Sequence, residues 1–571
     1  MKTPIIFLAG ILSITLASGK DKFAADIEKS KDKDGRVKVL VLYKDPIQAK
    51  EPTRLLDLGA TVAALFEATG ILKVEMAAAN VRTLSEQPEI QYIAPDRKLR
   101  PSLDYAAAAS QLTAAIRSEW TGAGIGVAVI DSGIDPHPDF QRGLVGALVY
   151  QESFLPGTLA QLDRQDSYGH GTHVAGIIGG NSNVAKGWGS TRSLAGIAPK
   201  VNLINLKVLD ADGYGTDSMV IAAIERTIAL KSRYNIRVAN LSLGRPVFES
   251  YLDDPLTQAV EKLWRSGVAV VVAAGNHGRD DSAGTKGYGT ITSPGNHPLV
   301  ITVGATRTMG TYDRTDDQMT SYSSKGPTAI DHVAKPDLVA PGNTIVSTMY
   351  TATSSMARAY PQNLVSTSYY SSFPISTTSG AYYKMSGTSM AAPMVAGAAA
   401  LLFQKDPTLT PDQVKARLMR SAAKVLPGIS VATDTVTGIT YNIQGDLFTA
   451  GAGYLDIRAA LADTSKLIGP AASPVAMQKD GDVFLSFANA SWGQSALWGE
   501  SALWGEKSVY GAGMFLNGSS ALWGESALWG ESATQGSSAL WGESALWGES
   551  ALWGESVSAA SADQLKARGD K

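Results

Sequence analysis

Residues 36–99 carry the first clear pattern of apolar and polar positions. The two kinds of residue alternate in the runs VKVLVLY, ILKVEMA and EIQYIAP, and such alternation is typical of strands with one buried face. The alanine-rich stretch at residues 55–68 and the run AANVRTLSEQP favour helices. The pattern therefore predicts a small α+β unit, just large enough to fold alone.

A different pattern extends from about residue 125 to residue 402. Helices are predicted at residues 219–234 and 256–266, and they alternate with the apolar runs GVAVID, VNLINLKVL, RVANLSL, VAVVVAAGN and LVITVGA. Strands that are apolar on both faces and alternate with helices are typical of a parallel sheet covered on both sides. This region is therefore predicted to have an α/β fold, with a doubly wound, mostly parallel sheet.

Two stretches outside these patterns are predicted to be irregular. Residues 100–117 are polar and alanine-rich, with Pro101 as a breaker, and we expect an exposed linker that proteases can reach. Residues 344–384 are rich in Ser, Thr and Tyr with little periodicity. This composition predicts a long surface insertion, which we expect near the functional site.

After about residue 471 the composition changes, and the hexapeptide SALWGE recurs. Its copies begin at Ser495, Ser501, Ser520, Ser526, Ser538, Ser544 and Ser550. An even period keeps every Trp on one face of an extended strand, whereas a helix would turn successive copies by about 240°. A strand or solenoid and a low-complexity tail are equally compatible with this repeat.

Composition and charge exclude several classes of protein. A formal net charge of −3 provides no broad basic field, which argues against nucleic acid or a membrane surface as the main partner. The chain contains no cysteine, so thiol nucleophiles, disulfides and thiolate metal sites are excluded. An exported protein of this kind must therefore be stabilised without disulfides.

The N-terminal residues are typical of a secretory signal peptide. Lys2 precedes an apolar stretch at residues 5–16, which small residues follow. The alternative is a short membrane anchor, but the stretch is shorter than the roughly 20 residues that span a bilayer. We therefore expect a secreted, extracellular protein with no membrane span.

Reactive residues are concentrated in three motifs, of which VAVIDSGID is the first. It brings Asp131 to the carboxyl end of a buried strand, the edge where ligand and catalytic groups of open α/β sheets gather. On its own, this carboxylate would be interpreted as a residue that caps a turn.

The second motif, GHGTHVAG, contains His170 and His173, two of only six histidines. Their i, i+3 spacing would allow a metal site, but no HExxH motif and no nearby acidic third ligand accompany them. A histidine beside a helix start is better suited to general base catalysis, because its ordinary pKa of about 6.5 lies close to working pH.

The third motif, MSGTSMAAPMVAGAAALL, places Ser389 between a glycine turn and an apolar helix. The hydroxyl then lies at the helix N-terminus, where the dipole and the free amides favour a developing oxyanion. A GTS sequence by itself would be interpreted as an ordinary helix N-cap. The combination of the three motifs changes that interpretation.

The motifs DSGID, HGTHVAG and GTSMAAP, in this order, resemble the subtilase family of serine peptidases over roughly residues 103–463. The order Asp, His, Ser separates them from the chymotrypsin and α/β-hydrolase arrangements. The resemblance implies that Asp131 orients His170, that His170 acts as general base and acid, and that Ser389 is the nucleophile of a serine endopeptidase. His173 then has a structural role.

Two further segments match the family. AAGN ends at Asn276, which the resemblance assigns to the oxyanion hole together with the backbone N–H of Ser389. Its alternative is a turn asparagine after a strand. The segment SLG, which comprises Ser242, Leu243 and Gly244, resembles the edge that pairs with extended substrate by strand addition.

The resemblance also covers the N-terminal unit, which is similar to the inhibitory propeptide of the family. The alternative is an independent small domain. We expect a zymogen that cuts itself between about residues 99 and 105. The predicted organisation is a signal peptide at 1–19, an inhibitory α+β propeptide at 20–102, a catalytic domain at 103–465 and a repeat-bearing C-terminal region at 466–571.

The expected partners are protein or peptide substrates, with the propeptide as an intramolecular inhibitor. Nothing acidic lies in the segments assigned to the pocket, which favours apolar residues at P1. The chemistry needs no cofactor, but structural calcium is common in the family. Asp139 resembles a calcium ligand, although the loop at residues 181–193 departs from the usual pattern. A competing hypothesis is an adhesion protein whose evenly spaced Trp residues bind a surface or a glycan.

Overall fold

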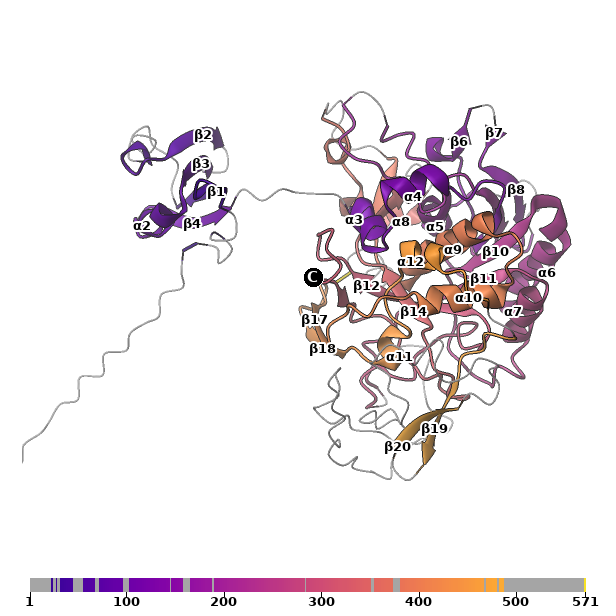
Figure 1. Cartoon of the computed structure of the whole chain (residues 1–571). Coiled ribbons are helices and arrows are strands. Elements are labelled where there is room, and N and C mark those ends of the chain that lie inside the picture. The colour runs from indigo at the N-terminus through magenta and orange to yellow at the C-terminus, as the bar shows by residue number, and fades with distance from the viewer. Residues whose placement is uncertain are drawn as a thin grey trace, which may run out of the picture. The chain divides into compact units, whose positions relative to one another are not determined.

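The chain forms two compact units, residues 1–99 and 100–571, which we describe separately (Figure 1). The predicted signal peptide and the SALWGE copies lie outside the residues that this computed structural model describes. These residues are 22–23, 27, 31–44, 55–66, 71–95, 102–143, 145–157, 165–186, 189–282, 284–350, 354–372, 380–466, 469–479, 482–486 and 569–570.

The first unit contains an antiparallel sheet in the order β2–β3–β1–β4. Its elements are β1 (Arg36–Tyr43), β2 (Thr61–Phe66), β3 (Ile71–Ala77), α2 (Val81–Ser85) and β4 (Ile90–Pro95). The strands expected from VKVLVLY, ILKVEMA and EIQYIAP are confirmed, because their alternate residues, such as Val39, Val41 and Val74, are fully buried.

The predicted helix at residues 55–68 is wrong over its second half, where β2 lies. Gly59 has a positive φ of 66° and ends a turn just before the strand, and the β-branched residues Thr61 and Val62 begin it. Pairing with β3 then satisfies the backbone of β2, which outweighs the helix propensity of its alanines.

The second unit is built on an eight-stranded sheet whose main path runs β13–β12–β11–β10–β5–β9–β8, with β14 paired to β12. Every pair is parallel except β12 with β13. The strands are β5 (Gly126–Asp131), β8 (Leu148–Ser153), β9 (Asn202–Lys207), β10 (Ile236–Leu241), β11 (Ala269–Ala273), β12 (Ile301–Arg307), β13 (Gln318–Met319) and β14 (Leu338–Pro341).

Two pairs of helices pack on this sheet (Figure 1). Helices α5 (His170–Gly179) and α9 (Thr388–Lys405) pack against each other and on β5 and β10–β12, and α6 (Asp217–Tyr234) and α7 (Pro255–Arg265) form the second pair. Residues of β5 and β11 are buried on both faces. The predicted mostly parallel sheet with helices is confirmed.

The stretch at residues 100–117 is largely helical rather than an exposed linker. It contains α3 (Ser102–Ala109) and most of α4 (Ala114–Glu119), and Ala106 and Ala109 have no exposed surface. Alanine has the highest helix propensity and loses no side-chain entropy on burial, so an alanine-rich run can form a helix and pack closely.

The described parts of residues 344–384 are also more ordered and more buried than predicted. Strand β15 (Ile345–Thr348) pairs with β16 (Tyr382–Met385), and α8 (Ser355–Ala359) lies between them in sequence. Tyr382 and Tyr383 are fully buried and their hydroxyls are hydrogen-bonded, which removes the cost of burying them. Ser354 Oγ donates to the Tyr168 carbonyl, so the segment does lie near the candidate site.

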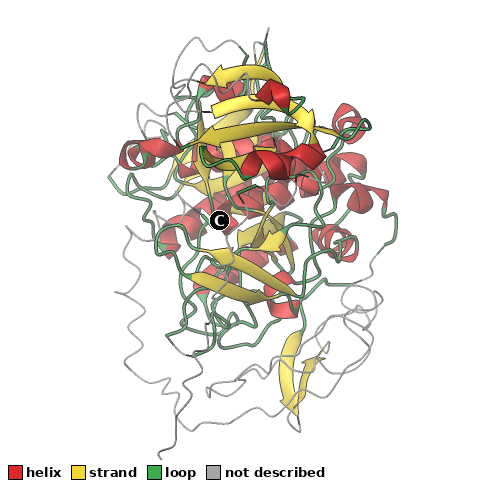
Figure 2. Ribbon diagram, turned by 90° about the vertical axis from the view of Figure 1, so that its left-hand side faces the viewer, coloured by secondary structure: helices red, strands yellow, loops and turns green. Residues whose placement is uncertain are grey.

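Small elements complete the second unit. They are β6 (Gln141–Arg142), β7 (Val145–Gly146), α10 (Pro411–Arg420), β17 (Ile429–Thr433), β18 (Thr440–Gln444), α11 (Leu447–Ala450), α12 (Ile457–Ala462), β19 (Val475–Lys479) and β20 (Asp482–Ser486). The C-terminal end of the chain lies beside the β17–β18 hairpin (Figures 1 and 2). Within the described residues, no helix combines the length and apolarity required to cross a bilayer.

Candidate active site

Asp131 and His170 form a buried, hydrogen-bonded pair at the carboxyl edge of the sheet. Asp131 is the last residue of β5, and His170 is the first residue of α5. The Nδ1 atom of His170 lies 2.7 Å from Asp131 Oδ1, and the two side chains are only 2% and 1% exposed. The backbone N–H of Ser132 also donates to that oxygen, at 2.8 Å. The carboxylate therefore fixes the orientation of the imidazole.

A close approach of two backbones brings this pair together. A side chain at Gly171 would place its Cβ only 2.2 Å from the carbonyl oxygen of Gly133. The start of α5 therefore contacts the turn after β5 directly, and only glycine fits at position 171.

Ser389 lies in the first turn of α9, after Gly387, and is 6% exposed. Its hydroxyl donates to the carbonyl of Ser242 at 3.1 Å, and Ser242 Oγ donates to the carbonyl of Ser389 at 2.9 Å. His170 Nε2 is buried and has no hydrogen-bond partner in the described part of the chain. A hydrogen bond between Ser389 and His170 is therefore not formed here, and hydrogen bonds of reacting groups are often long or poorly aligned before a substrate binds.

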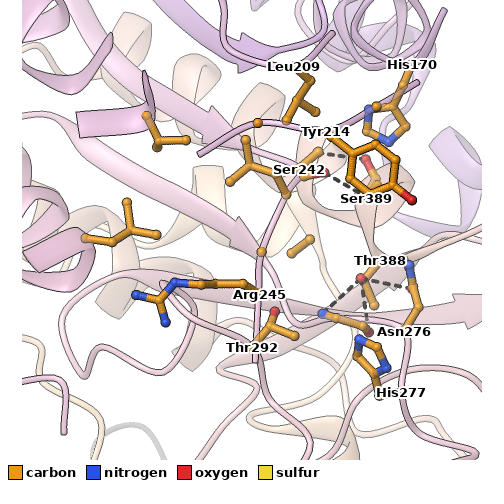
Figure 3. Close-up of a pocket in the computed structure, with 18 of the residues that line it drawn as sticks. His170, Leu209, Tyr214, Ser242, Arg245, Asn276, His277, Thr292, Thr388 and Ser389 are labelled. Atoms are coloured by element: carbon orange, nitrogen blue, oxygen red, sulfur yellow. Dashed lines mark hydrogen bonds between the residues drawn. The ribbon is translucent and has the colours of Figure 1, made fainter. Parts of the chain in front are cut away.

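Ser389 and His170 nevertheless line one cavity of about 710 Å³. Figure 3 shows the imidazole and the hydroxyl near each other at one end of it, with Asn276 further along. The predicted residues Asn276, Ser242, Leu243 and Gly244 also line this cavity. The three distant motifs and both additional segments thus meet at one site.

The side-chain amide of Asn276 is oriented by the residue that precedes Ser389. Its Oδ1 atom accepts hydrogen bonds from the N–H of Thr388 at 2.9 Å and from Thr388 Oγ1 at 3.2 Å. Since no residue in the described ranges accepts from Asn276 Nδ2, its two N–H donors are available to a ligand. The Ser389 N–H is also available, because the first N–H groups of a helix have no intrahelical acceptor.

The segment from Ser242 to Gly244 continues from the end of β10 along the cavity. Within the described residues, neither Leu243 nor Gly244 makes a backbone hydrogen bond, whereas Arg245 pairs with Ser293 on the other side. An unpaired edge of this kind can accept an extended peptide as an added strand.

Asp166 is an important residue that the sequence analysis missed. Its buried carboxylate accepts hydrogen bonds at 2.7 Å from Ser132 Oγ and from the N–H groups of Gly169 and Thr172. It thereby links the turn after Asp131 to the start of the His170 helix. Burial raises the pKa of this carboxyl. Its position four residues before His170, in a polar run, was the available signal.

His173 has a different environment from His170. Its Nε2 atom lies 3.2 Å from the Ile345 carbonyl and 3.0 Å from the Tyr383 carbonyl. Burial, with a smaller contribution from nearby His170, lowers the pKa of His173 to about 3. The ring is therefore neutral and donates to these carbonyls, where it connects α5 to the β15–β16 pair.

The cavity also contains charged residues that the segments SLG and AAGN did not reveal. Asp217, Asp280, Asp281, Arg245 and Arg279 line it. Arg245 forms ion pairs of 2.8 Å with Asp217 and 2.9 Å with Asp254, so its charge is largely compensated. Thr292 lies between the backbones of Gly244 and Gly275, where a Cβ on either glycine would approach it within 2.8 Å.

Asp139 does not offer free oxygens to a metal ion. Its carboxylate accepts hydrogen bonds from the Val184 N–H at 2.8 Å and from the Tyr382 hydroxyl at 2.7 Å, and it is fully buried. The Lys186 ammonium donates to the Asn181 carbonyl in the neighbouring loop. Over the described ranges, no three His, Asp or Glu side chains cluster as metal ligands. Calcium also binds backbone and amide carbonyl oxygens, so the calcium site at Asp139 stays a prediction.

Comparisons with known proteins identify the family of this chain. A profile of the subtilase family matches residues 122–453. Serine protease AprX of Bacillus subtilis (strain 168) is 36% identical over 352 residues, which are 60% of this chain and 71% of that protein. Subtilisin E of the same strain is 32% identical over 394 residues, 67% of this chain and 85% of that protein.

Among solved structures, a cold-adapted subtilisin-like serine proteinase aligns with a TM-score of 0.39 and 29% identity, over 59% of this chain and 90% of that one. The matched family and relatives define a serine-type endopeptidase that hydrolyses peptide bonds. The chain belongs to the subtilase family. Hydrolysis in this family needs no cofactor.

Proposed function

We propose that Asp131, His170 and Ser389 are the catalytic triad of a secreted endopeptidase made as an inactive precursor. The observation that carries this proposal is the 2.7 Å contact between Asp131 and His170, with the Ser389 hydroxyl in the same cavity. A serine hydroxyl becomes a strong nucleophile only when an oriented imidazole removes its proton. The buried pair meets that requirement once the hydroxyl turns from Ser242 to His170.

In the proposed reaction, Ser389 Oγ attacks the scissile carbonyl carbon while its proton moves to His170 Nε2. The resulting oxyanion accepts hydrogen bonds from Asn276 Nδ2 and from the Ser389 N–H. His170 then gives the proton to the leaving amine, and the C–N bond breaks. Water, deprotonated by His170, attacks the acyl-enzyme. His170 then returns that proton to Ser389 Oγ as the ester C–O bond breaks and the carboxylic acid product leaves. Asp131 holds the ring in one tautomer through its hydrogen bond to Nδ1.

The substrate is proposed to bind as an extended strand along Ser242, Leu243 and Gly244, with an apolar P1 side chain. Within the described residues, the unpaired backbone groups of Leu243 and Gly244 support the added strand, and the lining by Val220, Leu243 and Ala273 supports the apolar P1 preference. Both arginines of the cavity are compensated, Arg245 by Asp217 and Asp254 and Arg279 by Asp434 and Asp570, which leaves no strong positive charge for an acidic P1 residue.

A fluorophosphonate probe tests the triad, because it reacts only with an activated serine. The wild-type protein is expected to be labelled and to hydrolyse casein, whereas Ser389→Ala is expected to do neither while keeping its circular dichroism spectrum. Label that persists on Ser389→Ala, or no label on correctly processed wild type, would refute the assignment.

The precursor and its secretion form a separate part of the proposal. Support comes from the N-terminal signal pattern and from the separate compact unit at residues 1–99. In this scheme the unit at residues 20–102 inhibits the enzyme until self-cleavage between about residues 99 and 105. Ser389→Ala should then remain at precursor length, while N-terminal sequencing of secreted wild type should begin within that window. A wild type that stays uncut yet active would contradict the scheme.

The repeat region is proposed to hold the enzyme at a surface or glycan. Its support is the regular spacing of Trp, whose rings combine an apolar face with a hydrogen-bonding N–H. A peptide of four SALWGE copies is expected to bind insoluble polysaccharide, and the same peptide with Trp→Ala is expected not to bind. Equal retention of both peptides would exclude this role.

A further inference from the structure

The last described residues of the chain, Gly569 and Asp570, are buried in the subtilase unit. The side chain of Asp570 has no exposed surface, although it carries a charge and lies next to the chain end. Burying an unpaired carboxylate is very costly, so such a residue needs a site built to receive it.

The carboxylate of Asp570 is paired on both oxygens. Oδ1 lies 2.6 Å from Arg279 Nη2 and accepts from Ser321 Oγ at 2.8 Å, and Oδ2 accepts from the Ser321 N–H at 2.6 Å. Arg279 is itself fixed by a 2.7 Å hydrogen bond from Nε to Ser321 Oγ and by an ion pair with Asp434. A second buried cation, Arg307, also interacts electrostatically with Asp570.

The backbone of this pair is recognised as well. Asn343 exchanges two hydrogen bonds with Asp570: its Oδ1 accepts from the Asp570 N–H at 2.8 Å, and its Nδ2 donates to the Asp570 carbonyl at 3.0 Å. Thr435 Oγ1 donates to the carbonyl of Gly569 at 3.0 Å, and Asp570 forms an antiparallel bridge with Asp434.

The site also selects glycine before the aspartate. Gly569 has a φ of +65°, which side-chain-bearing residues rarely adopt. A Cβ at this position would lie 2.2 Å from Ser386 Oγ and 2.4 Å from Asn343 Oδ1. Charge, backbone and shape thus all specify a Gly–Asp pair.

This site directly adjoins the catalytic loops. Arg279 lines the cavity and is three residues after Asn276, and Ser386 is three residues before Ser389. Ser386 Oγ, the atom that a Cβ added to Gly569 would meet first, accepts a hydrogen bond from the Thr344 N–H. A Gly–Asp pair bound at this site therefore restrains two segments, the one from Asn276 to Arg279 and the one from Ser386 to Ser389.

We propose that the subtilase unit contains a receptor for its own Gly569–Asp570 pair, which docks as a latch between Arg279, Ser321 and Asn343 and restrains the loop that carries Asn276 and the start of α9, which carries Ser389. Strand β20, before the repeat region, and Gly569, after it, both belong to the subtilase unit, so the described residues on either side of the repeat region lie in the same unit. The receptor's ligand class is a peptide with Gly–Asp in a left-handed turn.

Carboxypeptidase B tests the latch without altering the site. It removes a C-terminal lysine, and the carbonyl of the bond it must cut, between Asp570 and Lys571, is the one bonded to Asn343. In full-length protein carrying Ser389→Ala, to prevent self-digestion, we expect Lys571 to be released at least about 30-fold more slowly than from a free peptide of residues 565–571. Release within about threefold of the free peptide would overturn the proposal.

Two variants in the same background test which groups hold the latch. Asp570→Asn removes the charge and Gly569→Ala adds the clashing Cβ, so both are expected to speed release of Lys571 at least about tenfold. Asp563→Asn, outside the described residues, is the matched charge control and should leave the rate unchanged. Equal rates in all four proteins would refute the assigned contacts.

Hydrogen exchange supplies a readout at the receptor itself. The Ser321 N–H donates to Asp570 Oδ2, so its exchange should accelerate in Asp570→Asn and not in Asp563→Asn. Amides of β9, distant from the site in the sheet order, report whether the variant is folded. Unchanged Ser321 exchange in a folded Asp570→Asn protein would show that no docking occurs.

Discussion

Ser242 and Ser389 exchange two hydrogen bonds, each hydroxyl donating to the other residue's carbonyl at 2.9–3.1 Å. The edge assigned to the substrate and the residue assigned as nucleophile are therefore linked directly. Asn240 Nδ2 supports the link through a 2.9 Å hydrogen bond to Ser242 Oγ. The proposed attack on a peptide requires the Ser389 hydroxyl to exchange the Ser242 carbonyl for His170 Nε2, so the hydroxyl is in a resting rotamer in this structure.

Asp131→Asn is expected to lower kcat by about 10⁴-fold, the size of loss typical of proteases with a Ser–His–Asp triad. An amide cannot accept the Nδ1 proton with the same charge compensation, and it favours the wrong tautomer of His170. Steady-state hydrolysis of a peptide p-nitroanilide measures the loss. The melting temperature should change little, because Asn retains the acceptor for the Ser132 N–H. Activity of Asp131→Asn within tenfold of wild type would contradict the proposal that Asp131 belongs to the catalytic triad.

Asn276→Ala is expected to reduce kcat by about 10²–10³-fold with KM nearly unchanged, since the amide acts mainly on the oxyanion of the transition state. Asn276→Asp is the matched control. It keeps an oxygen for the Thr388 N–H but replaces the donor with a carboxylate. A comparable loss in both variants assigns the effect to the missing donor, whereas an active Asp variant would assign Asn276 to loop structure alone.

Thr292→Gly is expected to enlarge the pocket and shift the P1 preference towards large residues. Thr292 fills the space between the Gly244 and Gly275 backbones, so its removal opens that space to the substrate. The ratio of kcat/KM for Phe over Ala at P1 should rise about tenfold. Thr290→Gly serves as control because Thr290 is buried nearby but does not line the cavity. An unchanged ratio would mean that P1 binds elsewhere.

Lys424 is expected to make stability depend on pH. Burial without a hydrogen-bond partner, within the described residues, lowers the pKa of its ammonium from 10.5 to about 8. Between these values the folded state binds fewer protons at Lys424 than the unfolded state. The free energy of unfolding therefore increases with pH across this window, and the penalty is fully present below about pH 8.

Replacing Lys424 with Met should therefore stabilise the protein by about 1–3 kcal/mol at pH 7 and by much less at pH 10.5. Melting temperatures of the Ser389→Ala protein at both pH values provide the measurement. The exposed lysine Lys262, changed to Met, is the control and should have no such pH-dependent effect. A gain for Lys424→Met that is equal at both pH values would indicate better packing instead of relief from a buried charge.

The sequence predicted the parallel sheet and the helices of the second unit because apolar runs and helical periodicity are local signals. Short motifs likewise predicted which residues would meet at the sheet edge. Asp166 escaped notice because its role depends on three donors from two separate segments. Two alanine-rich stretches were predicted wrongly. Residues 61–66, predicted to be helical, pair as a strand, whereas residues 102–109, predicted to be a linker, form a helix.

Tertiary context explains the remaining differences. The tyrosines at positions 382 and 383 resembled a polar surface stretch, and only the acceptors that meet their hydroxyls make burial favourable. Docking of Gly569 and Asp570 depends on Arg279, Ser321 and Asn343, which are more than 200 residues away in sequence. No local pattern reports contacts of this range.

The main-chain contact between Gly171 and Gly133 means that substitutions in the core and substitutions at this contact have different consequences. Core side chains around β5 and α5 can be exchanged for others of similar volume, with costs that fall on stability alone. The distance between Asp131 and His170 depends instead on the close contact of the Gly171 and Gly133 backbones. A Cβ added at Gly171 would force these two backbones apart. Relatives with another residue in place of Gly171 are therefore expected to keep the fold and lose peptidase activity.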